Sequence, residues 1–328
     1  MVERLSAGSS ITPVYGLRKL TRVGKIAFLF PGQGSQQPGM GTELLQDPEI
    51  ADLCLRCSDA GNVDLRRLLV EAGDEELKLT QNAQPALLFV GVGLAILLRR
   101  RGLEPAAAAG HSVGEYTALC AAGAMSPEDA LQAVVQRGIA MAEAVPAGTT
   151  SMIAVLGLAP EAVEAALVGV PDVWPANYNT PTQVVVGGTM LGLERATARL
   201  QEAGAKRVLP LNVSAAFHTP LVESAGSYLR GALEVVHWRL PPIPVVANLT
   251  AEPYSDPETI AVALERQLCS PVRWGDGVRK LVELGCESFL EVGPKRALTG
   301  MMRELAPGAF AAAVGTPQAV TEVAVPVH

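Results

Sequence analysis

Short apolar runs alternate with longer amphipathic stretches along the chain, a pattern typical of a mixed α/β fold. Lys25 to Phe30 is an apolar run that leads into Pro31-Gly32-Gln33-Gly34, so it predicts a buried strand followed by a tight loop. Ala106 to Ala109 predicts a second strand despite the low sheet propensity of alanine, because the strand-to-helix turn Gly110-His111-Ser112-Val113-Gly114 follows it. Helices are predicted up to about Arg101, through Ala122, and from Pro127 to about Ala144.

Residues 149–213 have a different rhythm, in which strands and helices follow the order βαββαβ. This order is the ferredoxin-like arrangement, and it predicts a small domain inserted into a larger one. The expected elements are a strand over Thr150–Leu158, a helix over Pro160–Val168, strands over Val173–Asn177 and Gln183–Gly188, a helix over Leu191–Ala203, and a strand over Lys206–Val213.

The insertion divides the chain into four parts. We expect residues 25–148 and 214–305 to form one large α/β domain with a parallel sheet, interrupted by the ferredoxin-like insert at 149–213. Residues 1–24 have weak periodicity and are expected to be an N-terminal extension. Residues 306–328 are rich in Ala, Val, Pro and Thr, which predicts a loose C-terminal tail.

The composition narrows the class of protein. Of the 328 residues, 49% are apolar and 18% are charged, as in a compact globular protein, and the net charge of −7 argues against a nucleic-acid partner. The apolar stretch Ala86–Leu98 is too short to cross a bilayer, and the first 24 residues lack the apolar run of a signal peptide. We therefore expect a cytoplasmic protein with no membrane partner.

The cysteines do not predict a disulfide framework or a metal centre. There are five, an odd number with irregular spacing. Cys54 and Cys57 form a CxxC, but they lie in a predicted helix and no second pair completes a zinc site. We expect no bound metal.

Gly110-x-Ser112-x-Gly114 is the pattern of a nucleophile elbow, in which glycines allow a sharp turn that exposes the serine hydroxyl. The pattern alone also fits a serine that merely caps a helix. The backbone N–H of Val113, directly after the serine, would be one donor to an acyl oxyanion. The Pro31–Gln36 loop could supply another, although it also fits an ordinary glycine-rich turn.

A serine nucleophile needs a base, and the chain has four histidines. His111 adjoins the serine and should point away from it, His237 lies in an apolar segment and is expected to pack, and His328 is the last residue. His218, where the chain re-enters the large domain, is the remaining candidate base. Arg137 follows on the helix after the elbow, either as a solvated surface charge or as a buried fork for a substrate carboxylate; spacing alone leaves both open.

Taken together, these segments resemble the malonyl-CoA:acyl carrier protein transacylases and, more broadly, the acyltransferase domains of polyketide synthases. The matching segments follow the family's order over roughly residues 25 to 305, which makes the resemblance specific. They are Phe30–Gln36, Gly110–Tyr116, Gln136–Gly138, Asn177-x-Asn179-x-Pro181-x-Gln183-Val184-Val185, Phe217-His218, Arg266–Leu268, Pro271-Val272-x-Trp274 and Glu291–Pro294.

The resemblance implies an α/β-hydrolase-like large domain with the ferredoxin-like insert, and a two-step transfer of malonyl from malonyl-CoA to the phosphopantetheine thiol of an acyl carrier protein. It implies no cofactor, and we expect a monomer. The implied roles are Ser112 as nucleophile, His218 as base, the N–H groups of Gln33 and Val113 as oxyanion donors, Arg137, Phe217 and Asn179 at the substrate, and the main-chain oxygen of Gln267 orienting the histidine.

Some positions depart from the family pattern, and two alternative functions remain. Phe217 and Val113 are similar to the malonyl-selective polyketide domains, and Ser270 stands where the family commonly has asparagine. The alternatives are a serine thioesterase or acyl hydrolase of the same fold, and a non-catalytic module that docks carrier proteins. A carboxylate-binding Arg137 argues against the hydrolase, and an intact Ser112 and His218 argue against the docking module.

Overall fold

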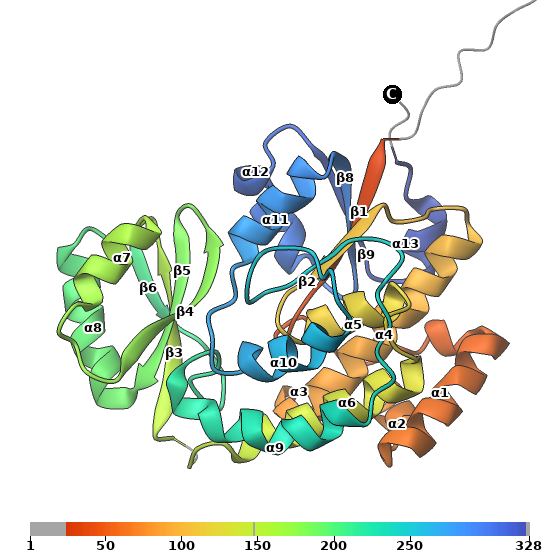
Figure 1. Ribbon diagram of the computed structural model, residues 1–328, viewed down its shortest axis with the longest axis horizontal. Helices are drawn as coiled ribbons and strands as arrows, with labels where there is room; N and C mark the ends of the chain where they lie inside the picture. Colours follow the sequence, from red (N-terminus) through yellow and green to blue (C-terminus); the bar gives the residue numbers. More distant parts are fainter. Residues whose placement is uncertain (1–23, 147, 326–328) are drawn as a thin grey trace, which may run out of the picture.

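The computed structural model describes residues 24–146 and 148–325, and in it the chain builds two units side by side (Figure 1). The larger unit surrounds a five-stranded parallel sheet, and the smaller one, drawn in green, is built on a four-stranded antiparallel sheet. The chain enters and leaves the smaller unit once, between a helix that ends at Glu143 and a 3-10 turn at Pro220.

The large sheet has the order β7-β2-β1-β8-β9, and its neighbouring strands are all parallel. Carboxyl ends of parallel strands meet at one edge of a sheet, which is where such folds place their sites. Phe30 of β1 and Gly110 of β2 are register partners at this edge, so the loops that follow both strands lie next to each other. The strands are β1 (Lys25–Phe30), β2 (Ala107–Gly110), β7 (Val245–Val246), β8 (Cys286–Val292) and β9 (Phe310–Val314).

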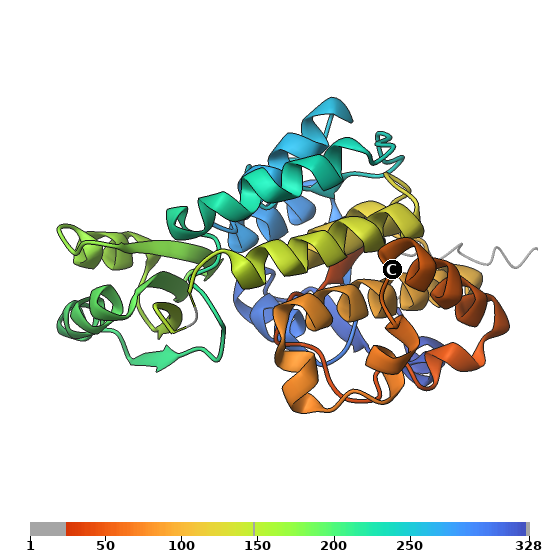
Figure 2. The same ribbon diagram turned by 90° about the horizontal axis from the view of Figure 1, so that it is seen from below.

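Helices cover both faces of this sheet (Figures 1 and 2). Strand side chains alternate between the two faces, so Phe28 and Phe30 pack into one core while Ala27 and Leu29 pack into the other. The first core includes α4, α5, α6 and α9, and the second includes α11 and α12. The helices of this unit are α1 (Pro48–Gly61), α2 (Leu65–Val70), α3 (Asp74–Lys78), α4 (Thr80–Arg100), α5 (Val113–Ala121), α6 (Pro127–Glu143), α9 (Glu223–Glu234), α10 (Glu258–Gln267), α11 (Trp274–Glu283), α12 (Ala297–Leu305) and α13 (Pro317–Glu322), with short 3-10 turns at Leu44–Gln46 and Pro220–Val222.

The smaller unit contains the six elements predicted for residues 149–213, in the predicted order. Its sheet order is β4-β5-β3-β6, and the two helices pack their apolar sides onto it. The last strand is shorter than the predicted Lys206–Val213, because it is an exposed edge strand that pairs only with β3. The elements are β3 (Thr150–Leu156), α7 (Pro160–Leu167), β4 (Val173–Thr180), β5 (Gln183–Thr189), α8 (Met190–Glu202) and β6 (Arg207–Pro210).

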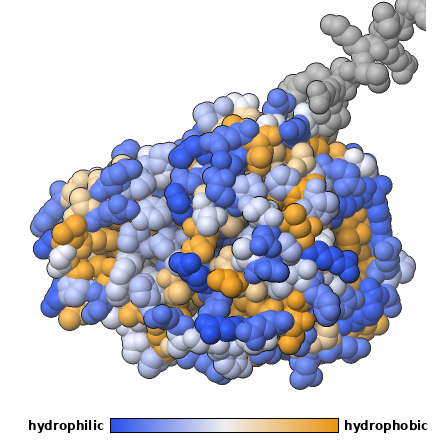
Figure 3. Space-filling view, in the orientation of Figure 1, coloured by the Kyte–Doolittle hydropathy of each residue, from blue (hydrophilic) through white to orange (hydrophobic). Residues whose placement is uncertain are grey.

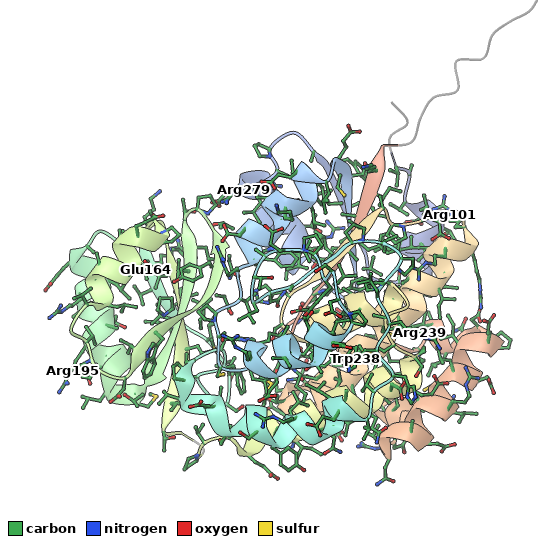
Figure 4. The ribbon with its side chains drawn as sticks, in the orientation of Figure 1. Arg101, Glu164, Arg195, Trp238, Arg239 and Arg279 are labelled. Atoms are coloured by element: carbon green, nitrogen blue, oxygen red, sulfur yellow. The ribbon has the colours of Figure 1, made fainter. Side chains whose placement is uncertain are left out.

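The prediction of a loose tail over 306–328 is wrong for its described part. Residues Phe310–Val314 form β9, which pairs in parallel with β8, and α13 follows. Arg101 Nη1 donates to the main-chain oxygen of Val323 at 2.8 Å, and Figure 4 places Arg101 beside this segment. The alanine-rich sequence resembles a loop by propensity, but an open edge of a buried sheet overrides that weak preference. Residues 1–23 and 326–328, which include most of the predicted extension and His328, lie outside the described residues.

Among the described residues, α4 is the one helix long and apolar enough to span a membrane. It is longer than the apolar stretch Ala86–Leu98, because Thr80–Pro85 extend it at its start. However, 78% of its apolar window is buried inside the protein, where Phe89, Val90 and Leu94 pack in the core. These are the properties of a core helix. On the outside, apolar residues are interspersed with polar ones over the face in Figure 3.

Candidate active site

Ser112 occupies the turn between β2 and α5 in a backbone conformation that L-residues rarely adopt, with φ 55° and ψ −114°. The glycines on either side are required by close approach. A Cβ on Gly110 would lie 1.9 Å from the carbonyl carbon of Gly114, and a Cβ on Gly114 would lie 2.1 Å from the main-chain oxygen of Phe30. The Gly-x-Ser-x-Gly spacing therefore permits the sharp turn that was predicted.

The Ser112 hydroxyl oxygen lies 2.8 Å from Nε2 of His218. The other ring nitrogen, Nδ1, lies 2.8 Å from the main-chain oxygen of Gln267, the last residue of α10. Carbonyl groups in the last turn of a helix lack intrahelical partners, so this oxygen is available as an acceptor. Nδ1 therefore carries the proton, and Nε2 is left to accept a hydrogen bond from the Ser112 hydroxyl. Of the candidate histidines, His218 is the one that the fold brings to the serine.

Burial keeps the His218 ring uncharged. Its side chain is 4% exposed, and this burial, with the Arg137 guanidinium as the second cause, lowers the pKa of His218 to about 3. A histidine with so low a pKa is neutral at neutral pH, so Nε2 can take a proton from the serine.

Arg137 is completely buried on α6 and points to the nucleophile. Its Nη2 donates to the Ser112 hydroxyl oxygen at 3.0 Å and to Oε1 of Gln267 at 2.9 Å. Its Nη1 donates to Oε1 of Gln84 at 2.7 Å, and the guanidinium lies 5.5 Å from the ring centroid of Tyr116. Of the two alternatives for this arginine, the solvated surface charge is wrong.

The loop after β1 lies against the elbow, as the register of the sheet requires. A Cβ on Gly32 would lie 2.7 Å from the main-chain oxygen of His111. Among the hydrogen bonds between described residues, none is donated by the main-chain N–H of Gln33 or of Val113. Val113 is the first residue of α5, where N–H groups have no intrahelical acceptor. Both N–H groups therefore remain available to an acyl oxygen.

Two further predicted residues, Asn179 and Phe217, lie around this centre. Asn179 is 3% exposed on β4, and its Oδ1 lies 3.0 Å from Nε2 of His111, so it contacts the neighbour of the nucleophile. His111 also packs on Trp274, with ring centroids 5.5 Å apart, and burial lowers its pKa. Phe217 is 5% exposed beside the base.

The expectation that His237 packs in the core is wrong, because its side chain is exposed. In the segment after α9, Val236 is buried, whereas Val235 and Arg239 are exposed with His237. Figure 4 labels Trp238 and Arg239 of this segment.

Sequence reasoning missed Asn248, which holds the elbow in place. Its Oδ1 accepts a hydrogen bond from the Ser112 N–H at 2.7 Å, and its Nδ2 donates to the Gly110 oxygen at 2.7 Å. Asn248 follows β7, a strand of two residues, which is too short to leave a pattern in the sequence. The sequence therefore gave no signal for this residue.

Glu115 lies within the Gly110–Tyr116 segment, and the sequence predicts no role for it. It is 1% exposed, and burial raises its pKa to about 7. Its carboxylate accepts hydrogen bonds from the Tyr254 hydroxyl at 2.6 Å, from Nε2 of Gln267 at 2.5 Å and from the Asn248 N–H at 3.1 Å. An acid in the first turn of a helix usually faces water, and this one faces the site.

The described residues contain no group of three or more His, Cys, Asp or Glu side chains placed to hold a metal ion. Cys54 and Cys57 are buried free thiols on α1. The groups that meet at the Ser112 hydroxyl are the neutral His218 ring and the buried Arg137 guanidinium.

Comparison with known proteins identifies similar sequences over most of the chain. A family model described as the acyl transferase domain matches residues 27–319. A malonyl CoA-acyl carrier protein transacylase of Bacillus subtilis is 40% identical over 301 residues, which are 90% of this chain and 95% of that protein. One of the same name from Escherichia coli K12 is 38% identical over 301 residues, which are 90% of this chain and 97% of that protein.

Solved structures are similar over the same extent. The malonyl CoA-acyl carrier protein transacylase of Coxiella burnetii has a TM-score of 0.88 at 34% identity, with 92% of this chain and 97% of that chain covered. A type II polyketide synthase acyl-carrier protein in complex with its malonyl-transacylase includes a chain with a TM-score of 0.86 at 38% identity, covering 90% of this chain and 98% of that one. The likeness therefore extends over both units of the fold.

Proposed function

The chain belongs to the acyl transferase domain family, among the malonyl CoA-acyl carrier protein transacylases, and on that basis we propose that it transfers malonyl from malonyl-CoA to an acyl carrier protein. One observation carries the proposal beyond the family: a buried guanidinium, that of Arg137, lies 3.0 Å from the Ser112 hydroxyl oxygen. A serine beside a fixed cation suits an acyl group that carries its own carboxylate.

In the first step, the Ser112 oxygen attacks the thioester carbonyl carbon while Nε2 of His218 takes the hydroxyl proton. The carbon–sulfur bond then breaks, and the histidine returns the proton to the coenzyme A sulfur. The products are a malonyl ester of Ser112 and free coenzyme A. The Gln267 oxygen stabilises the imidazolium formed in between, so no acid is needed behind the histidine.

In the second step, the phosphopantetheine thiol of the carrier protein attacks the ester carbonyl, and His218 takes the thiol proton. The bond from carbon to the Ser112 oxygen breaks, and the histidine returns the proton to that oxygen. The N–H groups of Gln33 and Val113 are the proposed donors to the oxyanion in both steps, supported by the finding that neither donates a hydrogen bond to another described residue.

Arg137 is proposed to hold the malonyl carboxylate through both steps. A guanidinium presents a planar fork that matches a carboxylate with two hydrogen bonds. Asn179 and Phe217 are proposed to line the acyl pocket, Asn179 through its contact with His111 and Phe217 beside the base. The acyl hydrolase alternative gains no support from this arginine, because hydrolysis of neutral acyl groups has no use for it.

We further propose the domain assignment that fits this chemistry. Residues 25–148 and 214–305 would be an α/β-hydrolase-like domain, extended by β9 and α13, and residues 149–213 a ferredoxin-like insert. The strand order β4-β5-β3-β6 supports the second name. The protein would act as a cytoplasmic monomer, with malonyl-CoA and a carrier protein as its only partners in the reaction.

The test is transfer between two separate substrates. The protein is incubated with malonyl-CoA and holo-acyl carrier proteins from fatty acid and polyketide pathways, and carrier mass is followed. We expect malonyl-carrier to accumulate and free coenzyme A to appear in equal amount. Release of free malonate without any malonyl-carrier would support the hydrolase instead.

A further inference from the structure

The side-chain amide of Gln267 lies between a group that can only donate and a group that can only accept hydrogen bonds. Its Oε1 accepts from Nη2 of Arg137 at 2.9 Å, and its Nε2 donates to Oε2 of Glu115 at 2.5 Å. A guanidinium has no acceptor and a carboxylate has no donor. When Glu115 is ionised, the amide can therefore satisfy both neighbours in one orientation only.

We infer that Glu115 is a positioning residue of the transfer reaction, which acts by fixing the Gln267 amide and, through it, the Arg137 guanidinium beside Ser112. The inference rests on the proposed function, because it concerns how the proposed carboxylate fork is held. Nothing in the two-step chemistry requires Glu115 to touch a substrate.

The reverse orientation of the Gln267 amide shows why this orientation has to be held. A reversed Gln267 would point its NH2 group at the Nη2 group of Arg137, donor against donor, and the guanidinium would lose its place. The main-chain oxygen of Ser112 is a second acceptor for Nε2, at 3.1 Å, but that bond is longer than the 2.5 Å bond to Glu115. Oδ1 of Asn248 is a third acceptor, at 3.5 Å, so the carboxylate is the closest of the three groups that orient the amide.

The same arrangement leaves the positive charge of Arg137 available to a substrate carboxylate. Its hydrogen-bond acceptors are two amide oxygens, of Gln84 and Gln267, and the hydroxyl oxygen of Ser112. None of these is a carboxylate, so these three contacts hold the guanidinium without pairing its charge; the charge of Glu115 acts on it from the other side of the Gln267 amide. Amides that fix a cation while leaving it unpaired suit a site whose substrate brings the carboxylate.

Two donors besides Gln267 explain how the Glu115 carboxylate is held in the protein interior. The Tyr254 hydroxyl and the Asn248 N–H each donate to it, and Asn248 is also the residue that holds the elbow. Burial raises the pKa of Glu115 to about 7, which measures the cost of placing the charge there. Arg137, Tyr116 and His218 are the other titratable groups around this cluster.

The experiment compares Glu115→Met with Glu115→Gln. Methionine is unbranched and of similar length but accepts no strong hydrogen bond, so it leaves Nε2 of Gln267 without the carboxylate. Glutamine keeps an oxygen for Gln267, because the Tyr254 hydroxyl can accept from its NH2 group. The readout is the ratio of malonyl to acetyl self-acylation rates, since acetyl carries no carboxylate for Arg137 to hold.

We expect the malonyl-to-acetyl ratio to fall about tenfold in Glu115→Met and to remain within about threefold of the wild type in Glu115→Gln. Glu291→Gln is the matched control. Glu291 is also 1% exposed, but it accepts hydrogen bonds from Leu298 and Thr299 at the start of α12. This control should change stability and leave the ratio unchanged.

Two results would overturn the inference: a malonyl-to-acetyl ratio that is unchanged in Glu115→Met, including the case in which both thioesters are slowed equally, or an equal fall of the ratio in Glu115→Gln and Glu115→Met. If Glu115→Met does not fold, Gln267→Met is tested in its place. This variant removes the middle member of the hydrogen-bonded series Glu115–Gln267–Arg137, and we expect the same fall in the malonyl-to-acetyl ratio. A wild-type protein that takes up no malonyl would instead contradict the proposed function. The two failures are therefore distinguishable.

Discussion

The main-chain oxygen of Gln267 lies 2.8 Å from Nδ1 of His218. This contact replaces the aspartate that orients the histidine in many serine enzymes, and it depends on the C-terminal end of α10, where carbonyl groups are free. The negative end of the helix dipole also faces the ring, which favours the imidazolium that forms during transfer. The orientation of the base is thus fixed by the main chain, and a search for a third acidic residue is unnecessary.

If His218 is the base, His218→Ala should slow self-acylation by about 10²–10⁴-fold while the fold persists, because the serine proton then has no acceptor. The measurement is the rate at which malonyl is added to the protein after mixing with malonyl-CoA. His237→Ala is the control, since the side chain of His237 is exposed. A large loss in the His237 variant, with none in His218→Ala, would contradict the assignment.

The pH dependence follows from the low pKa of His218, about 3. The base is neutral above that value, so its ring resonances in NMR spectra should not titrate between about pH 5 and 8. Between about 3 and 6.5 the unfolded chain binds a proton on this histidine that the folded protein does not, so its contribution lowers stability as the pH falls through this window. A titration near pH 6.5, absent from spectra of His218→Ala, would contradict this.

The core of the site could be predicted because its parts are local motifs. The elbow turn is encoded by glycines that a Cβ would forbid, and the Pro31–Gln36 loop reaches it because β1 and β2 are adjacent parallel strands. His218 could be predicted as the base because the chain has only four histidines. The burial of Arg137, in contrast, depends on α6 packing against α4, which spacing along one helix does not reveal.

The residues that were missed act through tertiary contacts. Asn248 follows a two-residue strand, and Glu115 was hidden because an acid at a helix start is ordinarily explained by the helix dipole. The Ala-, Val-, Pro- and Thr-rich composition of residues 306–328 predicts a loose tail, whereas β9 forms within it because it pairs with β8. In each case the deciding partner is far away in the sequence.

We expect Phe217 and Val113 to narrow the acyl pocket, so that malonyl is preferred over methylmalonyl. Both side chains are buried, Phe217 next to the base and Val113 next to the nucleophile. One methyl group changes the discrimination free energy between two substrates by about 1–3 kcal/mol in an apolar pocket. Phe217→Ala should therefore raise the relative rate with methylmalonyl-CoA by roughly 10-fold or more. The specificity constants for the two thioesters are the measurement. Equal constants in the wild type would remove this claim.

Arg137→Ala should lower the malonyl-to-acetyl ratio of self-acylation, because a charge-assisted bond contributes about 1.5–3 kcal/mol to holding the carboxylate. Arg137→Lys should restore little of it, since a point charge cannot reproduce the planar fork. Hydrolysis of the acyl enzyme should increase as water enters the vacated space. A ratio unchanged in both variants would show that the buried guanidinium has a structural role only.

The central claim is that Ser112 carries the malonyl group, and the intact mass of the protein after mixing with malonyl-CoA tests it most directly. The account predicts that the wild type gains the mass of one malonyl group and that Ser112→Ala gains none. Ser288→Ala, which removes a buried hydroxyl on β8, should be labelled like the wild type. A Ser112→Ala protein that still acquires malonyl, or a wild type that never does, would contradict the account.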